Sequence, residues 1–428
     1  MIKSNIKALL LLTSFCLLTA VNCDEENTYD VDVYSPIYAS LEELRQPIEA
    51  GAPEELKETG KIYLKDDFIF INEKQKGVHV IDNSLPENPR NIAFITIPGN
   101  IDIAVMDNIL YGDSFTDLVA LDISDPSAVQ EVKRIENVFT NRYQDPWSLS
   151  ELGWDNEFEA VDPDKGVVVG WEKTGTRTYE EDDDERRGFG CQPVEMMEDG
   201  ALSAGTDNSS GQGGSMAKFT IVDQYLYVLN GSDMQLFRID EPANPTMWVN
   251  VSVAWDIETI FPYEDKLFIG SMTGMYIFDN SDPANPTMIG QFSHATSCDP
   301  VVVQGHYAYV TLRGGTTCGG NTNQLDIIDI TDPIYPELVK TYAMQGPFGL
   351  ATDDNTLFVC DGEAGVKIFD STDVLNLELI TQIADYSAYD VILNNNIAIV
   401  ISPGGLYQYD YSDLDNIELL SSILISED

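Results

Sequence analysis

The chain has 428 residues, 43% of them hydrophobic, and a formal net charge of −49. A surface this negative repels nucleic-acid phosphates, which excludes DNA and RNA as ligands and favours cationic partners. The length exceeds that of one small domain, so the chain must hold either several domains or a repeat fold.

The amino terminus has the layout of an export signal. Lys3 and Lys7 are followed by an apolar stretch, residues 8–21, that is too short to span a bilayer. Cys23 comes directly after this region, and acidic residues follow it. The arrangement resembles a bacterial lipoprotein signal, with residues 1–22 removed and Cys23 lipidated; an ordinary secretory cleavage nearby is the alternative. We expect an exported protein, anchored at the outer membrane or cell surface.

Residues 23–57 form an acidic leader with one helical signal. Ser40 and Glu43 have the spacing of a capping box, in which the two side chains satisfy backbone donors at the start of a helix. We expect a spacer that carries one short helix.

The rest of the chain, residues 58–428, is dominated by a repeat. Short β-rich segments end in aspartate seven times, with spacings of 40, 118, 39, 50, 41 and 40 residues. The terminating residues are Asp82, Asp122, Asp240, Asp279, Asp329, Asp370 and Asp410. A long insertion, residues 137–216, follows the second unit. The side chain of each repeated aspartate is expected to anchor a turn.

Each unit has four short strands in the same order, with a turn before the fourth that contains proline in most units. Pro86, Pro126, Pro283 and Pro333 each lie four residues after the anchoring aspartate, where proline ends a strand. Four strands per period of about 40 residues is the signature of a propeller blade. We predict an all-β fold, a β-propeller of seven four-stranded blades. An eighth blade within the insertion, where residues 166–171 are predicted to form one more strand, is the alternative.

This motif resembles the LVIVD repeat family, β-propeller proteins found mostly among bacterial exported and surface proteins. Residues 276–286 and 325–336 match it best, and the resemblance covers roughly residues 58–425 apart from the insertion. It implies the fold, but the family has no general catalytic motif to transfer. The insertion contains an acidic run, residues 180–185, and a Gly/Ser-rich stretch, residues 205–214. Two interpretations of the insertion remain: it is a disordered or merely peripheral surface segment, or it is an arm that binds a partner.

Two cysteines are expected on one face of one blade. Cys298 precedes the fifth blade and Cys318 lies in its long loop, so a disulfide is the expected state in an oxidising compartment. Cys191 and Cys360 are expected on the same face, without an assigned partner. A metal site formed by His294, Cys298, Cys318 and Cys360 is the alternative, but no spacing matches a structural zinc signature. We expect no metal or cofactor, with a divalent cation at the acidic channel mouth as the alternative.

Acidic and aromatic residues are predicted to gather on that same face, around the central channel. The predicted binding face consists of Asp102, Trp255, Asp256, Glu258, His294, Asp299, Arg313, Asp361, Glu363, Tyr386, Tyr389 and Asp390. Crowded carboxylates there would raise one another's pKa or bind cations.

These patterns favour a binding protein over an enzyme. The sequence contains no nucleophile elbow, no His-Glu-x-x-His and no phosphate loop. We expect a non-catalytic envelope lipoprotein that binds a protein partner through this face and the insertion, and contacts the membrane only through its anchor. A propeller that binds or cleaves carbohydrate at the channel mouth is the alternative, because two carboxylates suffice for glycoside hydrolysis.

Overall fold

The computed structural model describes residues 28–139, 156–180, 210–255, 257–294, 300–314 and 322–425. Seven antiparallel sheets follow one another along the chain, each with four consecutive strands that we number as blades 1 to 7. Blade 1 contains β3 (Thr59–Lys65), β4 (Phe68–Glu73), β5 (Gly77–Asp82) and β6 (Arg90–Thr96), and blade 2 contains β7 (Ile103–Met106), β8 (Ile109–Ser114), β9 (Asp117–Asp122) and β10 (Gln130–Ile135). Blade 3 contains β14 (Phe219–Val222), β15 (Tyr225–Asn230), β16 (Asp233–Arg238) and β17 (Thr246–Ser252). Blade 4 contains β18 (Ile257–Tyr263), β19 (Lys266–Ser271), β20 (Gly274–Asp279) and β21 (Thr287–Ser293). Blade 5 contains β22 (Val301–Gln304), β23 (Tyr307–Leu312), β24 (Gln324–Asp329) and β25 (Glu337–Ala343). Blade 6 contains β26 (Leu350–Asp353), β27 (Thr356–Cys360), β28 (Val366–Asp370) and β29 (Glu378–Ile383). Blade 7 contains β30 (Asp390–Asn394), β31 (Ile397–Ser402), β32 (Gly405–Asp410) and β33 (Glu418–Leu424).

The blades form a closed ring, as the repeat predicts. The first strand of each blade contacts the first strand of the next, and β30 of the last blade contacts β3 of the first. These first strands therefore surround the central channel. We call the end where they begin, next to the links between blades, the link end, and the opposite end the turn end. The prediction of an all-β propeller with seven blades is confirmed.

Burial follows the position of each strand within its blade. Five of the six residues of β23, a second strand, are buried, whereas β25, the outermost strand of the same blade, has none. Blades pack face to face, so inner strands are covered on both sides and read as continuous apolar runs. Outer strands meet solvent, which explains their mixed sequences.

The repeated aspartates act as turn anchors. In six blades the carboxylate accepts the backbone N–H of the residue two positions later, as between Asp122 and Ser124 at 2.9 Å and Asp410 and Ser412 at 2.8 Å. Blade 3 departs from this pattern, because Asp240 pairs with Arg238 instead. In these six blades the bond holds the start of the turn that leads to the fourth strand.

The proline turn also joins neighbouring blades. The Tyr111 hydroxyl of blade 2 donates to the Pro242 carbonyl of blade 3 at 2.8 Å, and Tyr227 donates to Pro283 of blade 4 at 2.7 Å. Proline lacks an N–H but keeps its carbonyl acceptor. The turn that ends one strand thus receives a hydrogen bond from the preceding blade.

The leader contributes more than a spacer. Helix α1 (Leu41–Leu44) begins at Ser40 with the predicted capping box, and Glu43 completes it. Before it, β1 (Thr28–Ala39) pairs antiparallel with β12 (Val167–Glu180) of the insertion. The short strand β11 (Glu157–Phe158) extends this sheet, and the 3-10 helix η2 (Pro163–Lys165) leads into β12.

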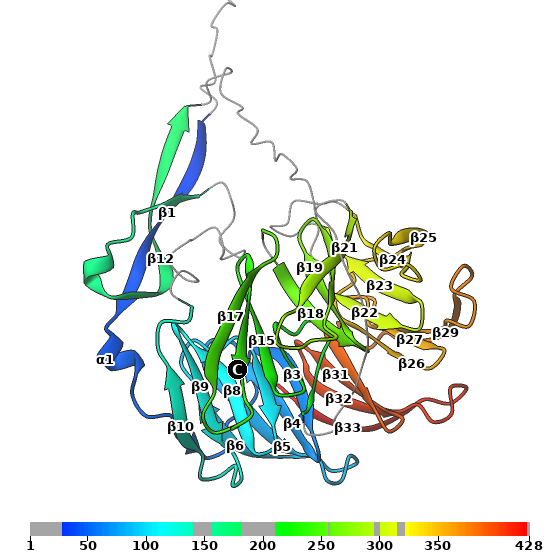
Figure 1. Cartoon of the computed structure of the whole chain (residues 1–428), viewed down its shortest axis with the longest axis horizontal. Coiled ribbons are helices and arrows are strands. Elements are labelled where there is room, and N and C mark those ends of the chain that lie inside the picture. Colours follow the sequence, from blue (N-terminus) through cyan, green and yellow to red (C-terminus); the bar gives the residue numbers. More distant parts are fainter. Residues whose placement is uncertain are drawn as a thin grey trace, which may run out of the picture.

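This sheet, which we call the arm, stands off the ring (Figure 1). The insertion strand that suggested an eighth blade belongs to the arm, so that alternative is wrong. The base of the arm packs against blade 2 through a cluster that includes Leu44, Phe115 and Val168. In the described part of the chain, no helix is long and apolar enough to cross a membrane.

Blade 1 carries two additional strands. β2 (Ala50–Gly51) of the leader pairs with its outer strand β6, and β13 (Gln212–Gly213) of the insertion pairs with its inner strand β3. The leader and the end of the insertion therefore both belong to the folded propeller.

Candidate functional site

The central channel is occupied by the end of the insertion. Residues 210–218, which we call the channel plug, run from the turn end to the link end. At the turn end Ser210 bridges to Met106, the last residue of β7. At the link end Ser215 bonds to Asp390, the first residue of β30.

The plug bonds to inner strands all around the ring. Its contacts reach blades 1, 2, 4, 6 and 7 before it enters blade 3 as β14. They are Gly213 with Tyr63 in the β13–β3 ladder, Gly211 N with Val105 O at 3.0 Å, Ala217 O with Ile260 N at 2.9 Å, Ser215 Oγ with Leu350 N at 2.9 Å, and Ser215 Oγ with Asp390 Oδ1 at 3.0 Å. One segment thus satisfies backbone and side-chain groups that would otherwise face the channel.

Glycine is needed in the plug because the channel is narrow there. A Cβ at Gly214 would lie 2.0 Å from Asp390 Oδ2, and one at Gly211 would lie 2.4 Å from the Leu64 carbonyl oxygen. From residue 210 onward, the Gly/Ser-rich stretch therefore packs in the centre of the propeller.

Asp102, predicted on the binding face, is buried with its carboxylate occupied. Oδ2 lies 3.0 Å from Lys61 Nζ and accepts the backbone N–H groups of Lys218 and Phe219, and Oδ1 accepts the N–H of Ile103 at 2.8 Å. Asp102 thus fixes the point where the plug enters blade 3.

Asp361, also predicted on the binding face, holds the link that leads into blade 6. Its side chain is fully buried and accepts the N–H groups of Gln345 and Gly346, each at 2.8 Å, and its Oδ2 lies 2.5 Å from Lys367 Nζ. The neighbouring Glu363 is exposed at the surface of the same loop.

Arg313 is the cation of an aromatic cluster that spans three blades. Its guanidinium carbon lies 3.8 Å from the centroid of the Phe348 ring, and that ring lies 4.8 Å from the ring of Tyr389. Burial lowers the pKa of Arg313, and the Glu258 carboxylate of blade 4 opposes that shift. A cation over an aromatic face is stabilised by the ring quadrupole.

The other predicted residues are spread over different surroundings. Tyr386 stacks on Tyr407 with ring centroids 4.0 Å apart, and burial raises its pKa. Trp255 is 61% exposed, and His294 is half-buried with its backbone N–H bonded to Thr273 O at 3.2 Å. Asp256 and Asp299 lie outside the described residues.

The cysteine predictions fall largely outside the described part of the chain, which does not include Cys23, Cys191, Cys298 or Cys318. Cys360 is described: it is a fully buried free thiol in β27, and burial raises its pKa well above the ordinary value. Within the described ranges, no three His, Cys, Asp or Glu side chains are placed to share a metal ion.

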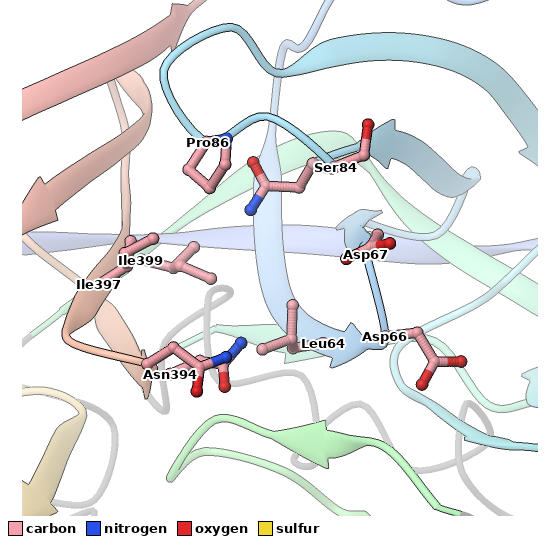
Figure 2. Close-up of a pocket in the computed structure, with 10 residues that line it drawn as sticks. Leu64, Asp66, Asp67, Ser84, Pro86, Asn394, Ile397 and Ile399 are labelled. Carbon is pink, nitrogen blue, oxygen red and sulfur yellow. The ribbon is translucent and has the colours of Figure 1, made fainter.

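A cavity of about 120 Å³ lies at the turn end, between blades 1 and 7. Leu64 and Asp67 line it from blade 1, and Asn394 and Ile399 line it from blade 7 (Figure 2). Asp66 at its rim is paired with Lys65 at 2.6 Å. The volume holds several water molecules, and it lies at the opposite end of the ring from the predicted binding face.

Three segments of the chain match the model of the LVIVD repeat: residues 100–137, 259–294 and 296–344. They correspond to blades 2, 4 and 5. No curated protein matches the chain.

Solved structures share the fold at low sequence identity. A protein from Lactobacillus plantarum is 12% identical with a TM-score of 0.52, covering 89% of this chain and 96% of that one. A periplasmic gluconolactonase of Pseudomonas aeruginosa is 9% identical with a TM-score of 0.51, covering 89% of this chain and 97% of that one. At these identities the likeness shows the propeller fold alone.

Proposed function

We propose that this β-propeller with LVIVD repeats is a non-catalytic lipoprotein of the cell envelope that binds a protein partner. Lipidation of Cys23 would anchor it at the outer membrane or cell surface, and the link end of the ring with the arm would face the partner. The export-type amino terminus and the cysteine after it support the anchor.

The arm is the observation that carries this proposal. It stands off the ring on a fixed base, with Tyr29 52% exposed and stacked on Tyr179 at 5.8 Å between ring centroids. Arg45, directly after α1, pairs with Asp117 of blade 2 at 2.8 Å, which holds the base in place. Protein interfaces are enriched in tyrosine, and a rigid support lowers the entropic cost of binding.

The channel plug supports a non-catalytic role. The carboxylates of Asp102 and Asp361 already accept hydrogen bonds from protein groups, and the plug contacts Asp390. A substrate in the channel would have to displace the plug and compete with these bonds, which is unfavourable for buried charges.

The test is partner capture from native membranes with point variants of the full chain. Tyr29→Ala with Tyr179→Ala should lose a partner that the wild type retains. Tyr335→Ala, which removes a 65% exposed tyrosine from the proline turn of blade 5, is the matched control and should retain it. Equal recovery with all three proteins would reject the arm as the binding surface.

The anchor is tested separately with Cys23→Ala. This variant should move from the membrane fraction to the soluble fraction and lose lipid labelling, while the purified protein still binds the partner. If it stays in the membrane fraction, another segment anchors the protein.

Carbohydrate binding is the second candidate, and the exposure of Trp255 favours it. An exposed indole can stack on a sugar ring, and the Glu258 carboxylate in β18 could accept hydrogen bonds from sugar hydroxyl groups. Oligosaccharide binding lost in Trp255→Ala and in Glu258→Gln would support it. A glycan array on which the wild type binds nothing would reject it.

A further inference from the structure

The plug meets one buried acid at the link end of the channel. Asp390 is 2% exposed, and its Oδ1 accepts hydrogen bonds from Ser215 Oγ and from the backbone N–H of Val391, both at 3.0 Å. Its Oδ2 is buried against Gly214 of the plug and has no hydrogen-bond partner. A charged carboxylate with one unsatisfied oxygen is costly in such a place.

The groups around Asp390 do not neutralise it. The facing cation is Lys61 on β3, whose ammonium group is bonded to Asp102 at 3.0 Å. The Cys360 thiol on β27 also faces Asp390 and stays protonated because burial raises its pKa. The Met216 backbone N–H of the plug favours the charged form without making a hydrogen bond of normal geometry. Burial outweighs these contributions and raises the pKa of Asp390 to about 6.

We propose that the channel plug is latched by a proton: a neutral Asp390 holds residues 210–218 in the channel, and a charged Asp390 loosens them. Opening of the plug would hydrate the Asp390 carboxylate and return its pKa to the ordinary value. The neutral acid therefore favours the closed channel and the charged acid favours the open one.

The sign and size follow from linkage. The pKa of the closed state, about 6, lies above the ordinary value of about 3.9 for an open, hydrated carboxyl. The protonation that stabilises the closed plug is complete below about pH 4 and is lost as the pH rises through 6. Between pH 5 and pH 7.5 the opening constant should rise roughly tenfold.

Amide hydrogen exchange of the plug in the full-length protein tests the latch. After correction for intrinsic exchange, protection of residues 210–218 should fall roughly tenfold from pH 5 to pH 7.5. In Asp390→Asn, which mimics the neutral acid, protection should be the same at both pH values. The matched control is Asp326→Asn, a buried carboxylate whose partners Gln324 and Thr341 lie in blade 5, and it should keep the fall.

A second variant keeps the proposal testable if Asp390→Asn fails to fold. Gly214→Ala places a Cβ 2.0 Å from Asp390 Oδ2, which is closer than any ordinary contact, and should displace the plug. Carbon-13 NMR of the labelled aspartate carboxyls should then show the pKa of Asp390 falling from about 6 towards the ordinary value. Wild-type protection that does not change with pH, or a pKa near 6 that persists in Gly214→Ala, would overturn the proposal.

Discussion

Asn83 and Gln408 exchange two side-chain hydrogen bonds across the seam where the ring closes. Asn83 Nδ2 donates to Gln408 Oε1 at 3.0 Å, and Gln408 Nε2 donates to Asn83 Oδ1 at 2.7 Å. Both side chains are buried. The strands of blade 1 all come from residues 50–213 and those of blade 7 from residues 390–424, so among the described strands no blade is shared between the two termini. Side chains, not strand exchange, hold this seam.

Removing either amide should therefore destabilise the ring. Gln408→Ala leaves the buried Asn83 amide without its partner, which costs about 1–3 kcal/mol in the free energy of unfolding. Chemical denaturation measures this change. The double variant Asn83→Ala with Gln408→Ala should cost less than the sum of the two single variants. Additive losses would show that the two amides act independently.

The glycine that opens the third strand of blade 7 should not tolerate a side chain. Gly405 has φ of 131°, and a Cβ there would lie 2.1 Å from the Ile423 carbonyl oxygen. Gly405→Ala should destabilise the protein by about 1–3 kcal/mol, measured by thermal unfolding. Gly175→Ala in the arm, where a Cβ would meet no described atom within 4 Å, should change stability by less than about 0.5 kcal/mol. Similar effects of the two substitutions would contradict this steric explanation.

Removal of the Arg45 side chain should loosen the base of the arm on blade 2. The guanidinium makes two hydrogen bonds to the buried Asp117 carboxylate, at 2.8 and 3.0 Å. Asp117 keeps Arg134 and a backbone donor from Asn137, so Arg45→Ala should cost about 2 kcal/mol and not unfold the ring. Limited proteolysis should then cleave the leader faster. Lys173→Ala, which removes an exposed ion pair to Asp32, should leave the cleavage rate unchanged.

The turn anchors should weaken in acid. The hydroxyl and N–H of Ser84, with Arg90, lower the pKa of Asp82 to about 2. This value lies below the ordinary pKa, so the stabilisation is present at neutral pH and is lost as the pH falls from about 4 to about 2. Asp82→Ala should lower the melting temperature at pH 7 and have little effect near pH 2. Glu87→Ala in the same exposed turn is the control, and a loss that persists at pH 2 would rule out this cause.

The disulfide between Cys298 and Cys318 remains a prediction from the sequence. Peptide mapping without reductant should recover the two cysteines as one linked pair. Cys360 should react with iodoacetamide only after unfolding, because its thiol is fully buried. Recovery of free Cys298 from protein purified under oxidising conditions would refute the pairing.

The repeated features of the fold could be predicted because the turns of the blades are held by hydrogen bonds between residues that are close in the sequence. Asp122 and Pro126 set the turn of blade 2 through neighbouring backbone groups, and Ser40 and Glu43 begin the helix through their own side chains. Local hydrogen bonds leave local sequence patterns.

The arm and the plug could not be predicted in this way. Tyr29 pairs with Tyr179, which lies 150 positions later in the chain, and Gly213 pairs with Tyr63 in the same non-local manner. No periodicity marks such contacts. Asp102 and Asp390, two of the acids at strand starts, each accept the backbone N–H of the residue that follows. That part of their role is local, whereas their contacts with the plug are not.

A segment that runs through the ring from one end to the other constrains the order of assembly. The plug is translated after blade 2, and its partners in blades 4, 6 and 7 come later in the chain. If the last blade docked on the first before residues 210–218 were in place, the segment would have to be threaded through a finished ring. This step is avoided if residues 210–218 dock first and the later blades then close the ring around them. We therefore expect the end of the insertion to take its place before blades 1 and 7 meet.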